Sequence, residues 1–141
     1  LLVALIAPTL LALPDRFAAV DASGNRDAQA WVDHALEVMA PGAVIVSWWS
    51  FSTPLWYGHF VEGMRPDVTI IDDRTILDDG YGDVKGAINT YLGKRPVYLI
   101  RLAQDIPAVE RDYELQLVDA IPATNGGAVY RVLPRAATEA R

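Results

Sequence analysis

The amino-acid sequence predicts an α/β fold, a three-layer sandwich in which helices cover both faces of a mainly parallel sheet of about five strands. Two observations predict it. Short apolar runs typical of buried strands alternate with amphipathic helical patterns along most of the chain, and such alternation gives right-handed crossovers between parallel strands. The last part has two strand-like runs around Asn125-Gly126, a strong signal for an antiparallel hairpin. A chain of 141 residues with 52% hydrophobic content can bury one proper core.

The first predicted helix follows Asn25, a typical N-cap residue, and ends at Pro41-Gly42. Its apolar residues recur at the spacing of one buried stripe. That stripe comprises Ala28, Trp31, Val32, Ala35, Leu36 and Met39. Residues 43–49 are then apolar on both faces except for Ser47, as expected for a central strand that helices cover on two sides.

The second predicted helix has Thr53 as its N-cap and Pro54 at its first helical position. It runs through Glu62, and Gly63 is suited to the left-handed cap that ends it. Because proline disfavours the helical region for the residue before it, the chain is expected to re-enter the sheet after Pro66, over residues 68–72.

The second half of the chain predicts one more helix, a strand and the hairpin. Val84, Ala87, Ile88, Tyr91 and Leu92 share one helical face, and Gly93 caps its end. The remaining predicted elements are a strand over residues 97–101, a helical turn over 106–112 capped by Asp105, and the hairpin strands 114–120 and 128–133.

The chain begins with an uncharged segment, LLVALIAPTLLALP, over residues 1–14. Two interpretations stay open: the end of a transmembrane helix, or an apolar helix that packs on this domain or on a second copy. Pro8 favours the first, because membrane helices tolerate proline better than soluble ones. The expected organisation is therefore this segment, a single α/β domain over residues 15–134 and a frayed tail over 135–141.

Composition excludes several classes of function. A formal charge of -6 and a pI near 4.7 argue against nucleic acid, which needs a basic face. The absence of cysteine excludes thiolate metal sites and thiol nucleophiles. The acid-rich run DDRTILDDGYGD does not match the spacing of a calcium loop, so its carboxylates are expected to serve as caps, with Asp78 and Asp79 capping the next helix, and no metal is expected. No phosphate-binding glycine motif is present, and no cofactor is expected.

The candidate ligand-binding residues follow the three predicted parallel strands, whose carboxyl ends meet at one edge of the sheet. They are Trp48, Trp49, Ser50 and Thr53 after the first strand, Asp72 and Asp73 after the second, and Arg101 and Asp105 after the third. Tryptophan faces stack on sugar rings, while aspartate and arginine bind hydroxyl groups in forked geometry. Alternate strand residues face opposite layers, so the competing expectation is that one of the two adjacent tryptophans packs in the core.

The aromatic cluster also carries a resemblance. The apolar segment ends, and a short linker with Asp21 leads into the Trp31 helix. Pro-Gly-Ala-Val-Ile-Val, a Thr-Pro-Leu-Trp-Tyr helix and Glu-Gly-Met-Arg-Pro-Asp-Val then follow, and the resemblance covers residues 21–98. In this order they resemble the C-terminal extracytoplasmic part of bacterial multi-spanning membrane proteins related to protein O-mannosyltransferases, a glycosyltransferase-like family.

The resemblance implies an accessory domain anchored on the outer face of a membrane. Its implied partners are its own upstream membrane region and a glycan or polyprenyl-linked sugar. In such transferases the catalytic acid is expected in an early loop between membrane helices, which has no counterpart in this chain. The resemblance therefore assigns no catalytic residue, and the expected function is non-catalytic.

Two other functions stay open. The first is a free-standing small α/β enzyme or sugar-binding domain that uses the strand-end crevice. The second is an interaction module, including a homodimer, in which residues 1–13 and exposed aromatic side chains bind a partner. For Arg65-Pro66-Asp67 a structural role is expected: Arg65 binds carbonyl groups at the end of the preceding helix, and Asp67 binds turn amides.

Overall fold

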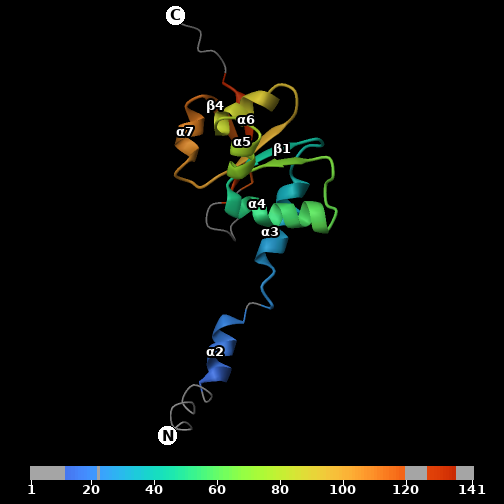
Figure 1. The fold of residues 1–141 in the computed structure, drawn as a ribbon, viewed down its shortest axis with the longest axis vertical. Coiled ribbons are helices and arrows are strands. Elements are labelled where there is room, and N and C mark those ends of the chain that lie inside the picture. Colours follow the sequence, from blue (N-terminus) through green and yellow to red (C-terminus); the bar gives the residue numbers. More distant parts are fainter. Residues whose placement is uncertain (1–11, 22, 120–126, 136–141) are drawn as a thin grey trace, which may run out of the picture.

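The computed structural model describes residues 12–21, 23–119 and 127–135, and it confirms the α/β fold (Figure 1). The predictions for residues 1–11, the Asn125-Gly126 turn and the tail from 136 lie outside the described residues. The strands are β1 (Val44–Ser47), β2 (Thr69–Ile71), β3 (Val97–Ile100), β4 (Tyr113–Asp119) and β5 (Val129–Pro134). The helices are α2 (Leu13–Val20), α3 (Asp27–Glu37), α4 (Trp49–Trp56), its π-helical continuation η1 (Tyr57–Val61), α5 (Asp73–Asp78), α6 (Val84–Tyr91) and α7 (Ile106–Glu110).

The five strands form one mixed sheet in the order β2-β1-β3-β5-β4. β1 lies parallel to both of its neighbours, so that Val46 is in register with Ile71 on one side and with Leu99 on the other. β5 runs antiparallel to β3 and to β4. The carboxyl ends of β1, β2 and β3 therefore share one edge of the sheet, as the sequence predicts.

Helices cover both faces of the sheet and give two hydrophobic cores, which makes the predicted three layers. α3 and α4 pack on one face and α5, α6 and α7 on the other. The first core includes Trp31, Leu36, Ile45, Leu55, Tyr98 and Val129. The second includes Val46, Ile71, Ile88, Leu99, Val109 and Val132. β1 contributes to both cores, because its alternate residues face opposite layers.

The start of α4 differs from its prediction. The strand ends at Ser47, and Trp48 is the N-cap of a helix that begins four residues before Thr53. The amides of Phe51 and Ser52 donate to the Trp48 carbonyl and close the first turn. Thr53 is thus not an N-cap. Its hydroxyl donates to the Trp49 carbonyl inside the helix.

Three capping predictions need correction, and one short helix was not predicted. The N-cap of α3 is Arg26 rather than Asn25, whose Oδ1 accepts from the Asp27 amide at 2.8 Å. The six-residue helix α5 was not predicted, and its N-cap is Asp72. The cap of α6 is Asp83, whose Oδ1 accepts from the Gly86 amide at 2.7 Å; Asp78 and Asp79 do not cap it. Asp105 stands at the N-cap position of α7, but its side chain makes no capping hydrogen bond there.

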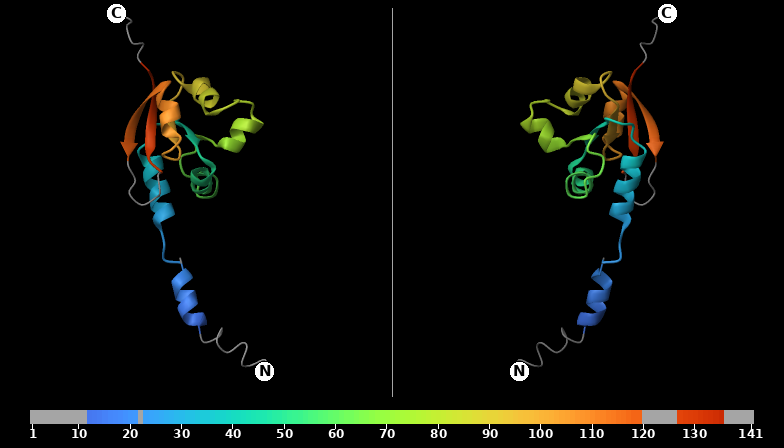
Figure 2. Two further views of the ribbon diagram at one scale, coloured as in Figure 1. Left: turned by 90° about the vertical axis from the view of Figure 1, so that its left-hand side faces the viewer. Right: turned by 90° about the vertical axis from the view of Figure 1, so that its right-hand side faces the viewer.

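The helix α2 stands apart from the domain in all views (Figures 1 and 2). None of its residues is buried. The sequence predicts an apolar helix only up to residue 14, whereas α2 begins at Leu13 and ends at Val20. Within the described ranges no helix combines the length and the apolar character needed to cross a bilayer.

Candidate functional site

Three residues that the sequence places at separate strand ends meet at the carboxyl edge of the sheet. Arg101, directly after β3, donates from Nη1 to Asp73 Oδ1 at 2.7 Å and to the Ser47 carbonyl at 3.3 Å. Its guanidinium carbon lies 5.1 Å from the centroid of the Trp48 ring. The prediction that strand ends gather these side chains is therefore correct for Trp48, Asp73 and Arg101.

The guanidinium of Arg101 is held rigidly because it is almost completely buried, with 7% of the residue exposed. The ion pair with Asp73 and the stacking on Trp48 offset the desolvation of its charge. Nη2 and Nε contact no hydrogen-bond acceptor among the described residues. Oδ2 of Asp73 is likewise buried without a partner in the described part of the chain. The pair thus keeps unused hydrogen-bonding capacity.

Arg101 lines a hollow of about 280 Å³ at this edge, called here the strand-end hollow. Its walls come from the start of α6, the end of β3 and the start of α7. The lining residues are Asp83, Val84, Lys85, Arg101, Gln104, Asp105, Ala108 and Val109. The lining is mainly apolar, with a few polar side chains that face the same space, which is the usual composition of a small-molecule site.

The charges around the strand-end hollow are dominated by carboxylates. Arg101 is paired with Asp73, and Lys85 forms an ion pair with Asp112. The hydrogen bond from Lys85 lowers the pKa of Asp112 below its ordinary value. Because both cations already have partners, the carboxylates of Asp83 and Asp105 add negative charge to the lining.

The other predicted site residues lie elsewhere or serve the fold. Asp72 is buried, and its Oδ1 accepts from both the amide and the hydroxyl of Thr75 at 2.8 Å. Trp49, Ser50 and Thr53 are exposed on the first turns of α4 and do not line the strand-end hollow. They belong to the surface of the helix.

The expectation that Trp48 or Trp49 packs in the core is wrong. Trp48 is half-buried against Arg101, and Trp49 is 58% exposed. The helix begins at Trp49, so the two residues do not alternate as strand residues would. The core tryptophan is Trp31, whose Nε1 donates to the Gly127 carbonyl at 3.2 Å.

Sequence reasoning missed the walls that α6 and the loop before α7 supply. Asp83, Lys85 and Gln104 belong to no recognisable motif, and they become neighbours only when the sheet forms. One signal could have found Gln104: it stands beside Asp105 in the short loop that leaves β3, at the edge where ligands bind in α/β sheets.

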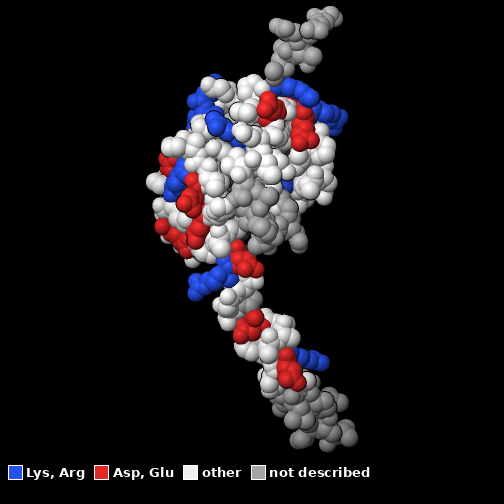
Figure 3. Space-filling model, turned by 180° about the vertical axis from the view of Figure 1, so that it is seen from behind, with Lys and Arg blue, Asp and Glu red and all other residues white. Residues whose placement is uncertain are grey.

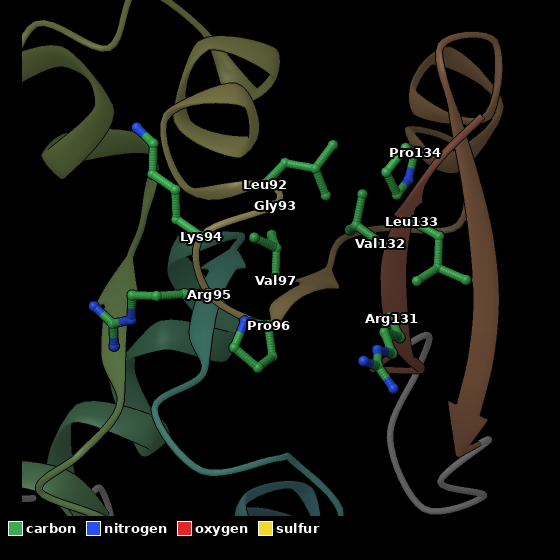
Figure 4. Close-up of a pocket in the computed structure, with 10 residues that line it drawn as sticks. All are labelled: Leu92, Gly93, Lys94, Arg95, Pro96, Val97, Arg131, Val132, Leu133 and Pro134. Carbon is green, nitrogen blue, oxygen red and sulfur yellow. The ribbon is translucent and has the colours of Figure 1, made fainter. Parts of the chain in front are cut away.

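A second hollow of about 290 Å³ lies at the opposite edge of the sheet, between the loop before β3 and the strand β5 (Figure 4). Lys94 and Arg95 direct their charged ends away from Leu92 and Val132 (Figure 4). Arg95 donates instead to the carbonyls of Gly42, Ala43 and Asp67 and to the Thr69 hydroxyl, at 2.7–3.2 Å. Its role is to connect the beginnings of neighbouring strands. Arg131, on the β5 side, is the remaining cation of the lining, and it is exposed.

Arg65-Pro66-Asp67 has the expected structural role, with one correction. Arg65 binds helix-end carbonyls, but those of α3 rather than of the preceding helix. Its guanidinium donates to the Leu36 carbonyl, to Met39 O at 3.0 Å and to Ala40 O at 2.9 Å. Asp67 accepts from Arg65 and from the Gly42 amide, which is the predicted binding of a turn amide.

Asp67 is expected to make stability sensitive to acid. The hydrogen bonds from Arg65 and from the Gly42 amide lower the pKa of its carboxyl far below the usual 3.8. Because the folded-state pKa is depressed, the stabilisation is present above pH 3.8 and is lost as the pH falls through the folded value. Urea denaturation should therefore show a difference between wild type and Asp67→Asn that is largest at neutral pH and shrinks below pH 3.8. A difference that stays constant into strong acid contradicts this.

The serine and histidine side chains of α4 and η1 do not form a nucleophile and base pair. Ser52 Oγ lies 2.5 Å from Ser47 Oγ, and both serines are fully buried. Nδ1 of His59 lies 3.1–3.2 Å from the carbonyls of Met64 and Arg65. Within the portion that the structure describes, no group of three His, Asp or Glu residues could hold a metal ion.

Comparison with models of protein families, with curated proteins and with solved structures gives no match for this chain.

Proposed function

We propose that this chain is a non-catalytic accessory domain of a glycosyltransferase-like membrane protein, held on the extracytoplasmic face, and that it binds a sugar unit in the strand-end hollow. The order of sequence motifs supports the membrane context. The residues that line the strand-end hollow support the binding of a sugar unit. Its ligand would be part of a glycan or of a polyprenyl-linked donor.

The observation that carries the proposal is the state of Arg101. This guanidinium is more than nine-tenths buried and fixed by Asp73 and Trp48, and it still has unpaired N–H groups beside the strand-end hollow. A preorganised fork of this kind binds a pair of neighbouring hydroxyl groups without losing side-chain entropy. Gln104 and Asp105 supply further donors and acceptors, and Val109 offers an apolar wall to ring C–H groups.

Charge favours a neutral sugar over a phosphate group as the occupant. The cations Arg101 and Lys85 are each paired with a carboxylate, and Asp83 and Asp105 remain in the lining. An anion in the strand-end hollow would meet uncompensated negative charge, which disfavours its binding. Hydroxyl groups would instead donate to the carboxylates and accept from Arg101.

Isotope-edited NMR titration of this chain with mannose, glucose and N-acetylglucosamine tests the proposal. We expect shifts at the Gln104 side-chain amide and at the backbone amides around the strand-end hollow. Gln104 is exposed, so Gln104→Ala should leave the fold intact. We expect it to weaken sugar binding about tenfold, which corresponds to about 1.4 kcal/mol. Gln116→Ala, at an exposed glutamine on β4, is the matched control and should bind as wild type does.

Three results would overturn the proposal. The first is the absence of shifts with all three sugars. The second is that inorganic phosphate, but no sugar, shifts the same signals, which would make the strand-end hollow an anion site. The third is hydrolysis of a sugar phosphate that is lost in Arg101→Ala, which would make the domain an enzyme. Separately, an upstream reading frame that encodes no membrane-spanning segment would contradict the proposed membrane attachment.

A further inference from the structure

We infer that the outer face of α4 and η1 is a contact surface for a lipid bilayer. This surface, called here the aromatic face, consists of Trp49, Tyr57, Phe60 and Val61. These side chains are 58%, 55%, 73% and 67% exposed. The inference rests on the membrane attachment in the proposed function but not on sugar binding.

The aromatic face is the outward side of one continuous helical segment. Ser52, Leu55 and Gly58 form the inward side and are buried against the domain. A Cβ built on Gly58 would lie 2.8 Å from Val32 Cγ1, so η1 is pressed onto α3 there. The four exposed side chains therefore cannot turn inward, and they stay directed away from the core.

The composition of the aromatic face fits the boundary between lipid and water. Trp49 and Tyr57 combine an apolar ring with one polar group, the combination enriched where membrane proteins cross the headgroup region. Phe60 and Val61 are purely apolar and suit the boundary between headgroups and acyl chains.

The position of the aromatic face identifies the bilayer as its occupant. α4 lies at the end of the domain that faces α2, in every view (Figures 1 and 2). α2 itself exposes Leu13, Phe17 and Val20 by 54–77%, and residues 1–14 carry no charged side chain. The exposed apolar side chains of α2 and the aromatic face thus lie toward the same end of the described structure. A membrane that holds the first would meet the second.

Charge indicates which lipid to use. The chain carries a net charge of -6, and on the face seen in Figure 3 basic side chains are interspersed with acidic ones. Anionic headgroups attract clustered lysine and arginine, and residues 49–61, which form α4 and η1, contain neither. We therefore expect binding to zwitterionic phosphatidylcholine, driven by apolar burial.

NMR of this chain on phosphatidylcholine bicelles that contain a headgroup spin-labelled lipid tests the inference. We expect the amide signals of Tyr57–Val61 to lose intensity several-fold more than the signal of Leu77. Leu77 is the internal control, because it is 71% exposed but lies on α5, over the other face of the sheet. In vesicle partitioning, Phe60→Ser should bind about tenfold more weakly than wild type. Leu77→Ser should match wild type.

Three different results would contradict the contact between the aromatic face and the bilayer. Loss of signal confined to α2 means that only the N-terminal part enters the bilayer, and it overturns the inference. Equal partitioning of Phe60→Ser and Leu77→Ser does the same. Concentration-dependent changes at Tyr57–Val61 in the absence of lipid mean that a second copy covers the aromatic face, and they also overturn it. None of these results alters the sugar titration, so the two proposals fail separately.

Discussion

Gly86→Ala is expected to lower the free energy of unfolding by about 3 kcal/mol, because it forces a backbone carbonyl out of place. A Cβ on Gly86 would lie only 1.9 Å from the carbonyl oxygen of Tyr81. The loop must then move away from the first turn of α6, which stretches the Asp83 cap on the Gly86 amide. It also disturbs the hydroxyl pair of Tyr81 and Tyr91, now 2.8 Å apart. Urea denaturation measures the loss.

Gly24→Ala is the matched control for Gly86. Gly24 has no atom within 4 Å of its added Cβ and needs no left-handed backbone, so alanine there should change stability by less than about 0.5 kcal/mol. Alanine is also the better helix former, which by itself would stabilise α6 by about 1 kcal/mol. A Gly86→Ala protein as stable as wild type would therefore show that the loop at Tyr81 moves aside with little loss of folding free energy. The same loop carries Asp83, so the strand-end hollow should change shape in this variant.

Arg65→Met is expected to cost about 3 kcal/mol, since it removes a charged donor from three helix-end carbonyls at once. Leu36, Met39 and Ala40 accept these hydrogen bonds near the end of α3, where no following turn can supply amides. Methionine keeps an unbranched apolar stem at this position, so the loss reports mainly on the guanidinium. Arg65 also adopts a φ of 44°, which is strained for a non-glycine residue and which these contacts hold in place.

Arg74→Met provides the comparison for Arg65. Arg74 also pairs with an aspartate, Asp78, but its side chain is 78% exposed. Exposed pairs contribute little, so this variant should lie within about 0.5 kcal/mol of wild type in urea denaturation. Equal losses in the two variants would show that charge, rather than the binding of carbonyls, accounts for the effect of Arg65.

The sequence predicts the layers and the sheet well, because periodicity and caps are local signals. The apolar runs of β1 and β3 need no tertiary information. The start of α4 was misplaced because Pro54 is typical of a first helical position, whereas here it stands inside the helix and a π-helical turn follows. α5 was missed because its six residues are too few to show a helical period.

The candidate site was predictable only in part. The rule that parallel strands end at one edge is enough to bring Trp48, Asp73 and Arg101 together. It does not predict that the Trp48 ring lies against the Arg101 guanidinium, or that the Asp72 carboxylate serves as the N-cap of α5. Those outcomes depend on where the helices begin, and the N-cap of α4 lies five residues before the predicted Thr53, at Trp48. The walls from α6 and α7 depend on long-range packing, which a single sequence does not encode in any motif.

The contact between the first helix of the domain and its last strand has a consequence for biosynthesis. Trp31 of α3 donates to the carbonyl of Gly127, and Val129 of β5 is fully buried in the same core. Trp31 leaves the ribosome 96 residues before Gly127, so α3 is synthesised well before the strand that completes its cover. The apolar stripe of α3 therefore waits in water, or with a chaperone, while the intervening residues are translated. The first core can close only after β5 has been synthesised.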